Sequence, residues 1–235
     1  MAVKEFTEIK EKLARATRIM VNEGLIELSG HPSTRVPGTD HLCVLGHLHE
    51  EGRTLRATST EDIITVDMDG KLVEGNHEPP GEIYLHTEIY KARSDVNSVL
   101  HTHPPVTIAL GIAGIPVKAV WLAGAAFGQG VPIFESACQI DTPEIGQKLA
   151  QVLGNQMAVM LKGHGAVTVG VSIEQACSIS LNLEKTAKLM LMAGQFGQVP
   201  PMSAEDLARY SNRGRTDSEE SRKGFWAYYG ERLPQ

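Results

Sequence analysis

The sequence contains few of the residues that characterise several large classes of protein. Its 235 residues include three cysteines, an odd number without a CxxC pair, so neither a disulfide framework nor a cysteine-based metal motif is expected. No apolar run suits a signal peptide or a membrane span. The net charge of −6 and the lack of a basic cluster argue against a nucleic-acid surface. We therefore expect a cytoplasmic protein with no nucleic-acid partner and no membrane partner.

The remaining composition is that of a globular chain with a distinct C-terminal segment. Hydrophobic residues make up 42% of the sequence and charged residues 21%, and the length suits one domain, expected at 1–210. Residues 211–222 are charged and lack apolar side chains, which predicts a mobile linker. Residues 225–229 concentrate aromatic side chains, so we expect the segment 211–235 to end in a part that docks on this chain or on a neighbouring subunit.

A histidine pair stands at the end of a predicted strand. The apolar run 96–100 leads into His101-Thr102-His103 and two prolines, which end the strand. Side chains alternate along a strand, so His101 and His103 point to the same face and can share one ligand. Imidazole is the commonest ligand of zinc and related ions. The alternative is that both histidines are surface residues or hydrogen-bonded polar groups.

Two further segments favour a metal site. The apolar strand 157–161 runs into Gly163-His164-Gly165, where the glycines allow a tight turn that can direct His164 inward. Glu82 opens a helix predicted at 82–93; a carboxylate there also suits the helix dipole without any ligand. Together, three imidazoles and one carboxylate predict a mononuclear site for Zn²⁺, Mn²⁺, Fe²⁺ or Co²⁺ with open positions.

In their order and spacing, Glu82, His101-Thr102-His103 and Gly163-His164-Gly165 resemble the motifs of the class II aldolase/adducin family, over about residues 10–195. The resemblance implies an α/β fold: a single-domain three-layer α/β/α sandwich around a central, mostly antiparallel sheet. It also implies one divalent metal ion per subunit, bound by His101, His103 and His164, with Glu82 as the acid/base group and sometimes a ligand. Family members form homotetramers whose sites lie near subunit interfaces.

The residues around 29–38 form a polar segment that we expect to be a loop. As a connector, such a loop collects serine, glycine and proline for backbone reasons. As part of a site, it would bring His31, Ser33 and Arg35 to the substrate. The sugar-phosphate aldolases of the family have a Gly-Asn-x-Ser loop here and Ser-Ser before the glutamate, whereas this chain has Gly-His-Pro-Ser and Pro80-Gly81. Proline offers neither an N–H nor a hydroxyl to a phosphate.

These departures favour a small, non-phosphorylated carboxylate substrate, met by Arg35 and His31. The pattern looks most like the decarboxylases of dihydroxylated aromatic acids such as dihydroxyphthalate. The metal would stabilise an enolate, and Glu82 would move the proton. The alternative enzyme is a class II (retro-)aldolase or epimerase of a sugar phosphate or hydroxy-oxo acid. A binding module like adducin is disfavoured because this chain keeps the full metal set.

Two further groups of residues have competing interpretations. His47 and His49 form a second His-x-His between glycines, which we expect to be a solvated loop and not a metal site. In the family, C-terminal residues close the active site of an adjacent subunit. Tyr228 or Tyr229, with Tyr229 as the candidate, would then supply a proton, although the use of aromatic anchors in general favours a role in helix docking.

Overall fold

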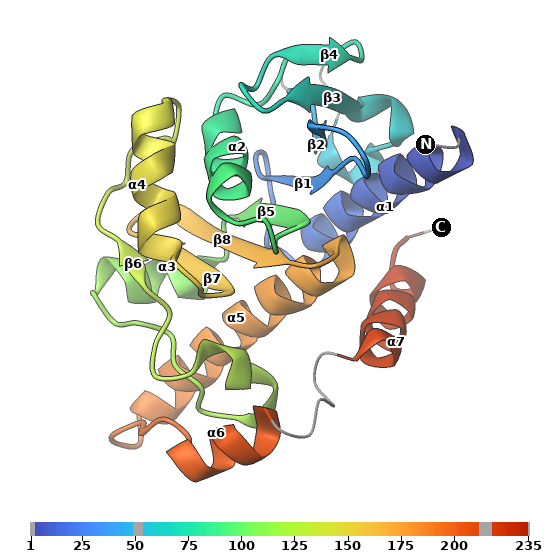
Figure 1. Ribbon diagram of the computed structural model, residues 1–235. Helices are drawn as coiled ribbons and strands as arrows, with labels where there is room; N and C mark the ends of the chain where they lie inside the picture. Colours follow the sequence, from blue (N-terminus) through green and yellow to red (C-terminus); the bar gives the residue numbers. More distant parts are fainter. Residues whose placement is uncertain (1–2, 49–53, 212–217, 235) are drawn as a thin grey trace.

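The computed structural model describes residues 3–48, 54–211 and 218–234 (Figure 1). One eight-stranded sheet runs through it in the order β4-β3-β2-β1-β5-β8-β7-β6. All neighbouring strands are antiparallel except β6 and β7, which are parallel. The strands are β1 His31–Arg35, β2 His41–Leu45, β3 Ile63–Asp67, β4 Leu72–Glu74, β5 Ser98–Thr102, β6 Ile133–Phe134, β7 Ala158–Leu161 and β8 Gly165–Gly170.

Helices cover both faces of this sheet. The α-helices are α1 Val3–Asn22, α2 Ile83–Ala92, α3 Pro105–Ile112, α4 Pro143–Leu153, α5 Ile173–Gly194, α6 Ala204–Ser211 and α7 Glu219–Glu231, and short 3-10 helices lie at Leu55–Ala57, Thr60–Asp62 and Leu122–Phe127. Helices α2 and α4 pack together on one face, while α1, α3 and α5 lie on the other (Figure 1). The predicted three-layer sandwich with a mostly antiparallel sheet is therefore confirmed.

The alternation of side chains along β2 shows how the two layers are separated. Leu42 and Val44 belong to the apolar cluster under α2 and α4, whereas Cys43 and Leu45 belong to the cluster under α1 and α5. Successive side chains of a strand point to opposite faces, so one short apolar strand supplies both cores. This strand is buried on both faces because helices cover both, which explains its continuous apolar sequence.

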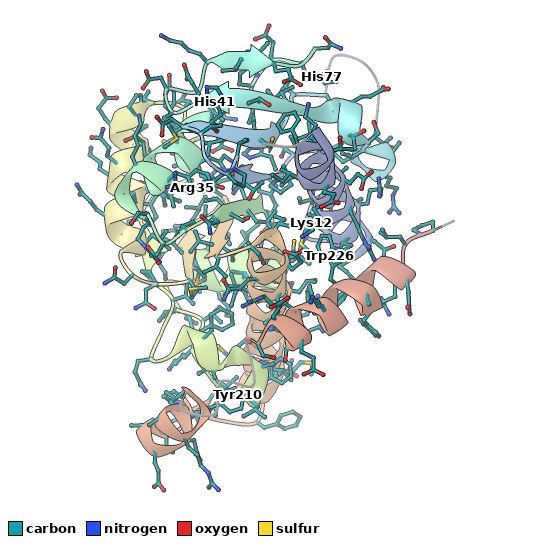
Figure 2. All side chains as sticks on the ribbon, turned by 45° about the vertical axis from the view of Figure 1, so that its right-hand side comes forward. Lys12, Arg35, His41, His77, Tyr210 and Trp226 are labelled. Atoms are coloured by element: carbon teal, nitrogen blue, oxygen red, sulfur yellow. The ribbon has the colours of Figure 1, made fainter. Side chains whose placement is uncertain are left out.

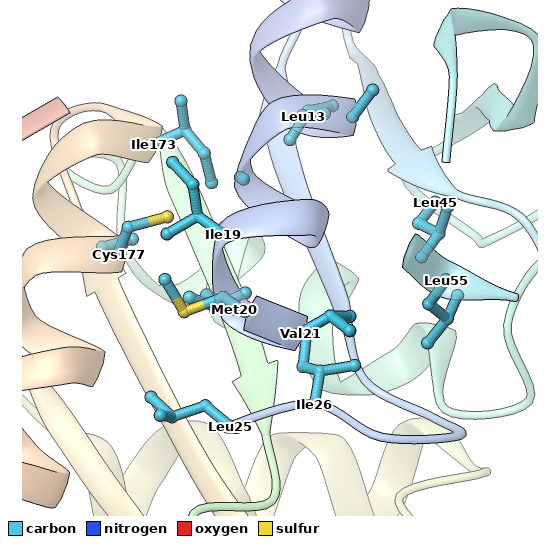
Figure 3. Close-up of a cluster of buried hydrophobic side chains, with 14 of the residues drawn as sticks. Leu13, Ile19, Met20, Val21, Leu25, Ile26, Leu45, Leu55, Ile173 and Cys177 are labelled. Atoms are coloured by element: carbon cyan, nitrogen blue, oxygen red, sulfur yellow. The ribbon is translucent and has the colours of Figure 1, made fainter. Parts of the chain in front are cut away.

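The cluster under α1 joins segments far apart in the sequence. Figure 3 shows Leu13, Ile19 and Met20 of α1 facing Ile173 and Cys177 of α5. These five side chains are at most 4% exposed. The amphipathic period of α1 thus buries one of its faces, and this helix covers the far face of the strands that carry the candidate site.

The segment expected to be a polar loop contains a strand instead. Residues His31–Arg35 form β1, which lies between β2 and β5 and pairs with both. The sequence of β1 needs no apolar alternation, because its backbone is held by pairing on both sides and its polar side chains bond to groups of α2 and β5. This tertiary pairing overrides the local propensity of the residues.

The C-terminal segment is more helical than its charge pattern indicated. Residues 219–222, assigned to the linker, form the first turn of α7, while 212–217 lie outside the described residues. The Ser218 hydroxyl accepts a hydrogen bond from the Ser221 N–H at the start of α7, and Lys223 pairs with Glu219 at 2.7 Å, so local capping stabilises this turn. Trp226 of α7 lies against α1 (Figure 2), where its ring stacks near the Arg15 guanidinium.

Within the described part of the chain, every helix is too short or too polar to cross a membrane.

Candidate metal centre

Three histidines converge at one end of the central strands. His101 is in β5, His103 follows β5 directly, and His164 lies in the turn between β7 and β8. Because β5 pairs with β8 through Thr102 and Ala166, this turn lies beside the end of β5. One ring nitrogen from each histidine falls within 4.8 Å of the other two. The structure therefore brings together the three histidines that the sequence predicted as ligands.

Backbone carbonyls orient two of these rings. His101 Nδ1 lies 3.1 Å from the Ala166 carbonyl oxygen, and His103 Nδ1 lies 3.0 Å from that of Ser29. A carbonyl only accepts hydrogen bonds, so each Nδ1 carries the proton and each Nε2 keeps its lone pair. This is the usual arrangement behind a metal-binding imidazole.

Glu82 completes the cluster from the start of α2. Its Oε2 lies 3.3 Å from His101 Nε2 and 3.5 Å from His164 Nε2, and its Oε1 accepts a hydrogen bond from the Ile140 N–H at 2.9 Å. Burial tends to raise the pKa of Glu82, but contacts with His101, His164 and the Ile140 amide outweigh it and hold this pKa well below its usual range. Glu82 is therefore an anion at neutral pH.

The donor set fits a divalent cation. His101 Nε2 is buried without a hydrogen-bond partner, and its lone pair faces an anionic oxygen, an arrangement that a cation between the two atoms would resolve. Burial, together with the neighbouring His101 and His164, lowers the pKa of His103 to about 4, so this imidazole is neutral at pH 7, as a metal ligand must be. Nitrogen and carboxylate donors of this kind suit Zn²⁺, Mn²⁺, Fe²⁺ or Co²⁺.

The two glycines beside His164 serve different purposes. Gly163 adopts φ +68°, a left-handed conformation that favours glycine. A side chain on Gly165 would overlap the Thr102 carbonyl oxygen and would come within 3.0 Å of His103 Cδ2 and 3.2 Å of His101 Cε1. The backbone of β8 thus approaches the other two histidines closely only because residue 165 has no Cβ.

A cavity of about 150 Å³ opens beside Glu82. Four leucines contribute to its wall, and its described lining contains no lysine or arginine. The residues that line it are Leu28, Ser29, Gly30, His31, Leu45, Gly46, His47, Leu48, Leu55, Pro80, Gly81, Glu82 and Gln139. This wall is suited to a small apolar body that carries a few polar groups.

The three predicted substrate-binding residues lie at different depths. His31 is paired with His101 across β1 and β5, its ring lies 5.3 Å from that of His101, and it lines the cavity. Ser33 is fully buried, with its Oγ 2.6 Å from His86 Nδ1 and 2.9 Å from the Tyr90 hydroxyl. Within this chain, His31 is therefore placed to meet a ligand, whereas Ser33 lies behind it.

The expectation that Arg35 binds the substrate has to be corrected for this chain. Its Nε donates to the Val96 carbonyl at 2.9 Å, and its Nη2 donates to those of Tyr90 at 2.6 Å and Arg93 at 3.3 Å. Arg35 is four residues along β1 from His31, which corresponds to about 13 Å, and it lies beside α2 (Figure 2). The guanidinium thus binds the carbonyls at the end of α2, a common role of arginine near a helix C-terminus.

His86 is the residue of this region to which the sequence assigned no chemical role. It is fully buried on α2, and its Nε2 lies 2.7 Å from His31 Nδ1. Burial lowers the pKa of His86 to about 3, so it is neutral. The sequence did contain a signal for His86. Positions i and i+4 share a helix face, and His86 lies one turn after Glu82 and one turn before Tyr90, so these three side chains are expected on the same face.

Neither Tyr228, Tyr229 nor His47 belongs to the cluster of three histidines. Tyr229 is 6% exposed in the apolar cluster under α1, and its hydroxyl accepts a hydrogen bond from Lys185 Nζ at 2.6 Å. Tyr228 is largely exposed. His47 is exposed at the wall of the cavity, and His49 lies outside the described residues. A proton-donating role of Tyr229 stays a prediction.

Comparisons with known proteins agree with this geometry. The family model described as "Class II Aldolase and Adducin N-terminal domain" matches residues 11–191. The chain is 30% identical over 217 residues to a 3,4-dihydroxyphthalate decarboxylase of Arthrobacter keyseri, with 87% of each sequence covered. It is 28% identical over 203 residues to an L-fuculose phosphate aldolase of Escherichia coli O157:H7, with 86% of this chain and 89% of that one covered.

A solved structure has a similar fold. The L-fuculose 1-phosphate aldolase from Glaciozyma antarctica PI12 superimposes with a TM-score of 0.82 at 25% sequence identity, over 97% of this chain and 89% of that one. The matched family segment contains Glu82 and all three histidines of the cluster.

Proposed function

Because this chain belongs to the class II aldolase and adducin family, whose members matched here include lyases, we propose that it is a divalent-metal-dependent carboxy-lyase acting on a dihydroxylated aromatic acid. One observation supports this proposal above the others. Four leucines contribute to the wall of the cavity that Glu82 lines, and no lysine or arginine is among its described lining residues. A flat aromatic ring suits such a wall better than a phosphate does.

His101, His103 and His164 would hold the cation, with Glu82 beside it. A bound cation would supply Lewis-acid withdrawal of electron density from two vicinal hydroxyl groups of the substrate. The similarity to the 3,4-dihydroxyphthalate decarboxylases of Arthrobacter keyseri and Rhodococcus jostii (strain RHA1), which are 30% and 28% identical to this chain, supports a substrate of this type.

In the proposed reaction, Glu82 would carry the proton. Its Oε1 is occupied by the Ile140 amide, which leaves Oε2 for proton transfer. As an anion, Glu82 would take a proton from a substrate hydroxyl on binding. When the carboxylate leaves as CO₂, its bonding electron pair stays on the ring carbon, and Glu82 Oε2 returns the proton there. The proton thus moves from a hydroxyl oxygen to the ring carbon, the product forms as a phenolate, and one proton from water restores its hydroxyl group.

The direct test is release of CO₂ from 3,4- and 4,5-dihydroxyphthalate. Protein stripped with a chelator and then reloaded separately with Zn²⁺, Mn²⁺, Fe²⁺ or Co²⁺ should release CO₂ only in the reloaded state. Glu82→Gln is the matched variant, because it keeps the shape of the side chain but cannot take the proton. Metal-loaded protein that releases no CO₂ from any vicinal dihydroxy acid contradicts the proposal.

A class II aldolase acting on a sugar phosphate is the second candidate, because L-fuculose phosphate aldolases are about as similar to this chain. A small phosphorylated enediolate analogue distinguishes the two. Strong competitive inhibition by it would favour the aldolase, whereas inhibition by catechol carboxylates and not by the phosphorylated analogue would favour the decarboxylase.

We also propose a homotetramer with its sites near subunit interfaces, as the family implies. Large apolar side chains remain exposed around α3 and α5, among them Ile112, Leu122 and Phe196, which is 92% exposed. Exposed apolar surface of this kind supports subunit association. Light scattering of the metal-loaded protein should give four chains per particle; a monomer at assay concentration would contradict this part.

A further inference from the structure

A line of hydrogen-bonded side chains runs from the wall of the cavity into the interior. His31 Nδ1 lies 2.7 Å from His86 Nε2, His86 Nδ1 lies 2.6 Å from Ser33 Oγ, and Ser33 Oγ lies 2.9 Å from the Tyr90 hydroxyl. His31 and Ser33 belong to β1, and His86 and Tyr90 belong to α2. Two elements that pack face to face therefore supply alternate members of one chain of bonds.

The spacing of the two elements explains why these four residues meet. Residues i and i+2 of a strand lie on one face, about 6.6 Å apart. Residues i and i+4 of a helix also lie on one face, about 6 Å apart along the axis. The pair His31 and Ser33 therefore matches the pair His86 and Tyr90, so each ring or hydroxyl meets its partner without distortion.

Water does not set the direction of these bonds. His86 and Ser33 are fully buried, Tyr90 is 2% exposed, and His31 is 8% exposed. Among the described residues, Ser33 Oγ is the one hydrogen-bond acceptor within reach of the Tyr90 hydroxyl. If the Tyr90 O–H did not donate to Ser33, it would be buried without an acceptor, which proteins rarely tolerate.

The direction of the first bond determines all the others. The Tyr90 O–H donates to Ser33 Oγ, so the single proton of Ser33 donates to His86 Nδ1. His86 is neutral, so its proton is on Nε2 and is donated to His31 Nδ1. His31 Nδ1 is then an acceptor, and the proton of a neutral His31 must be on Nε2. This nitrogen has no partner among the described residues and is not sealed in the interior, so it opens onto the cavity.

We infer that Tyr90, Ser33 and His86 act as positioning residues that fix His31 as the Nε2-protonated tautomer, which donates a hydrogen bond to a carboxylate oxygen of the ligand in the cavity. The inference deepens the proposed function, on which its choice of ligand rests. His31 Nε2 would then offer the ligand carboxylate a neutral hydrogen-bond donor. The described lining of the cavity contains no cationic side chain that could do so instead. It also distinguishes His31 from the three metal-binding histidines, because a protonated Nε2 cannot be a ligand.

The tautomer can be observed directly. In Zn²⁺-loaded protein labelled with ¹⁵N-histidine, long-range ¹H–¹⁵N correlation should show His31 with a protonated Nε2 and an unprotonated Nδ1. A His31 protonated on Nδ1 in this protein overturns the inference. His31→Asn, which deletes the ring, assigns the signal.

Two substitutions of His86 test the positioning role. His86→Gln keeps an N–H facing His31 and should retain the Nε2-protonated tautomer, whereas His86→Leu removes the donor and should give a mixture of tautomers. Tyr90→Phe deletes one oxygen and should also mix the tautomers. Unchanged His31 spectra in both His86→Leu and Tyr90→Phe would overturn the role of these residues.

Ligand binding supplies the second measurement. Calorimetry should show that His86→Leu binds 3,4-dihydroxybenzoate about tenfold more weakly than wild type, while catechol, which has no carboxylate, binds equally to both. His86→Gln should bind both probes within about threefold of wild type. Equal weakening for both probes would indicate general damage to the site and would overturn the inference. Neither measurement uses turnover, so a protein that releases no CO₂ but shows this tautomer and this selectivity refutes the proposed function alone.

Discussion

The two glycines that flank His164 should respond differently to the same substitution. Gly163→Ala and Gly165→Ala each add one methyl group. At residue 163 the added methyl would meet only ordinary contacts, 3.7 Å from Ala137 Cβ and 3.8 Å from Ile112 Cγ1. At residue 165 it would overlap the Thr102 carbonyl, which belongs to the peptide between His101 and His103.

The expected costs follow from these positions. Gly163→Ala places a Cβ in a left-handed conformation and should lower the free energy of unfolding by about 1–2 kcal/mol. Gly165→Ala is an overpacking substitution with an expected cost of about 1–3 kcal/mol. Stability alone therefore does not separate the variants. Metal affinity should separate the two variants, because only the methyl group of Gly165→Ala presses on the backbone and rings of two candidate ligands. For Gly165→Ala we expect the metal affinity to fall by about 10- to 100-fold, as it does when other groups that orient metal ligands are changed.

The assay is a competition titration of Zn²⁺ against a chromophoric chelator, with metal content by mass spectrometry and urea unfolding of the metal-free proteins. Gly163→Ala serves as the matched control and should keep wild-type zinc affinity. If Gly165→Ala binds zinc as tightly as Gly163→Ala does, the argument that close approach of β8 builds the site is wrong.

Three further predictions concern the residues around this site. His103→Ala should remove bound metal while the far-ultraviolet circular dichroism spectrum is retained; full metal occupancy in this variant would exclude His103 as a ligand. Arg35→Ala removes three charge-assisted hydrogen bonds, two to the end of α2 and one to the Val96 carbonyl, so it should lower the free energy of unfolding by about 2–3 kcal/mol, with Arg35→Lys intermediate; unchanged urea unfolding would refute this. The pKa of His86 is about 3 in the folded protein and 6.5 in the unfolded chain. As the pH falls below 6.5, protonation of this residue in the unfolded chain should therefore lower the free energy of unfolding of the metal-free protein by about 1.4 kcal/mol per pH unit. Urea unfolding from pH 7 to 4.5 measures this, and an equally steep pH dependence in His86→Phe would contradict it.

The metal cluster could be predicted from sequence because its geometry is local. A strand places residues i and i+2 on one face, so the apolar run before His101 and His103 was enough to pair them. The Gly-His-Gly turn after a second apolar strand and the glutamate at a helix start supplied the other members. The sequence did not show why residue 165 must be a glycine. It is needed because β8 approaches the end of β5 closely, and not because of an unusual backbone conformation. This reason depends on which strand lies beside β8, and a single sequence does not show that.

The residues behind the cluster were not predictable in the same way. Strand β1 has the sequence His-Pro-Ser-Thr-Arg, which resembles a loop because its polar side chains are satisfied by partners more than fifty residues away. His86 looked like one of several residues on a helix face. Its role depends on the pairing of β1 with β5, a long-range contact that no local pattern encodes.

The corrected position of Arg35 changes how the site is understood. Helix α2 begins at the metal cluster, where Glu82 meets His101 and His164, and ends where Arg35 binds the carbonyls of Tyr90 and Arg93. Between these ends, His86 and Tyr90 bond to the same strand that carries Arg35. Strand β1 thus contacts α2 along most of its length, and the lateral position of Glu82 follows from contacts up to three helical turns away. Ser33 and Arg35, which resembled substrate ligands in the sequence, therefore bond to the helix that begins at Glu82, and of the three expected substrate ligands only His31 lines the cavity.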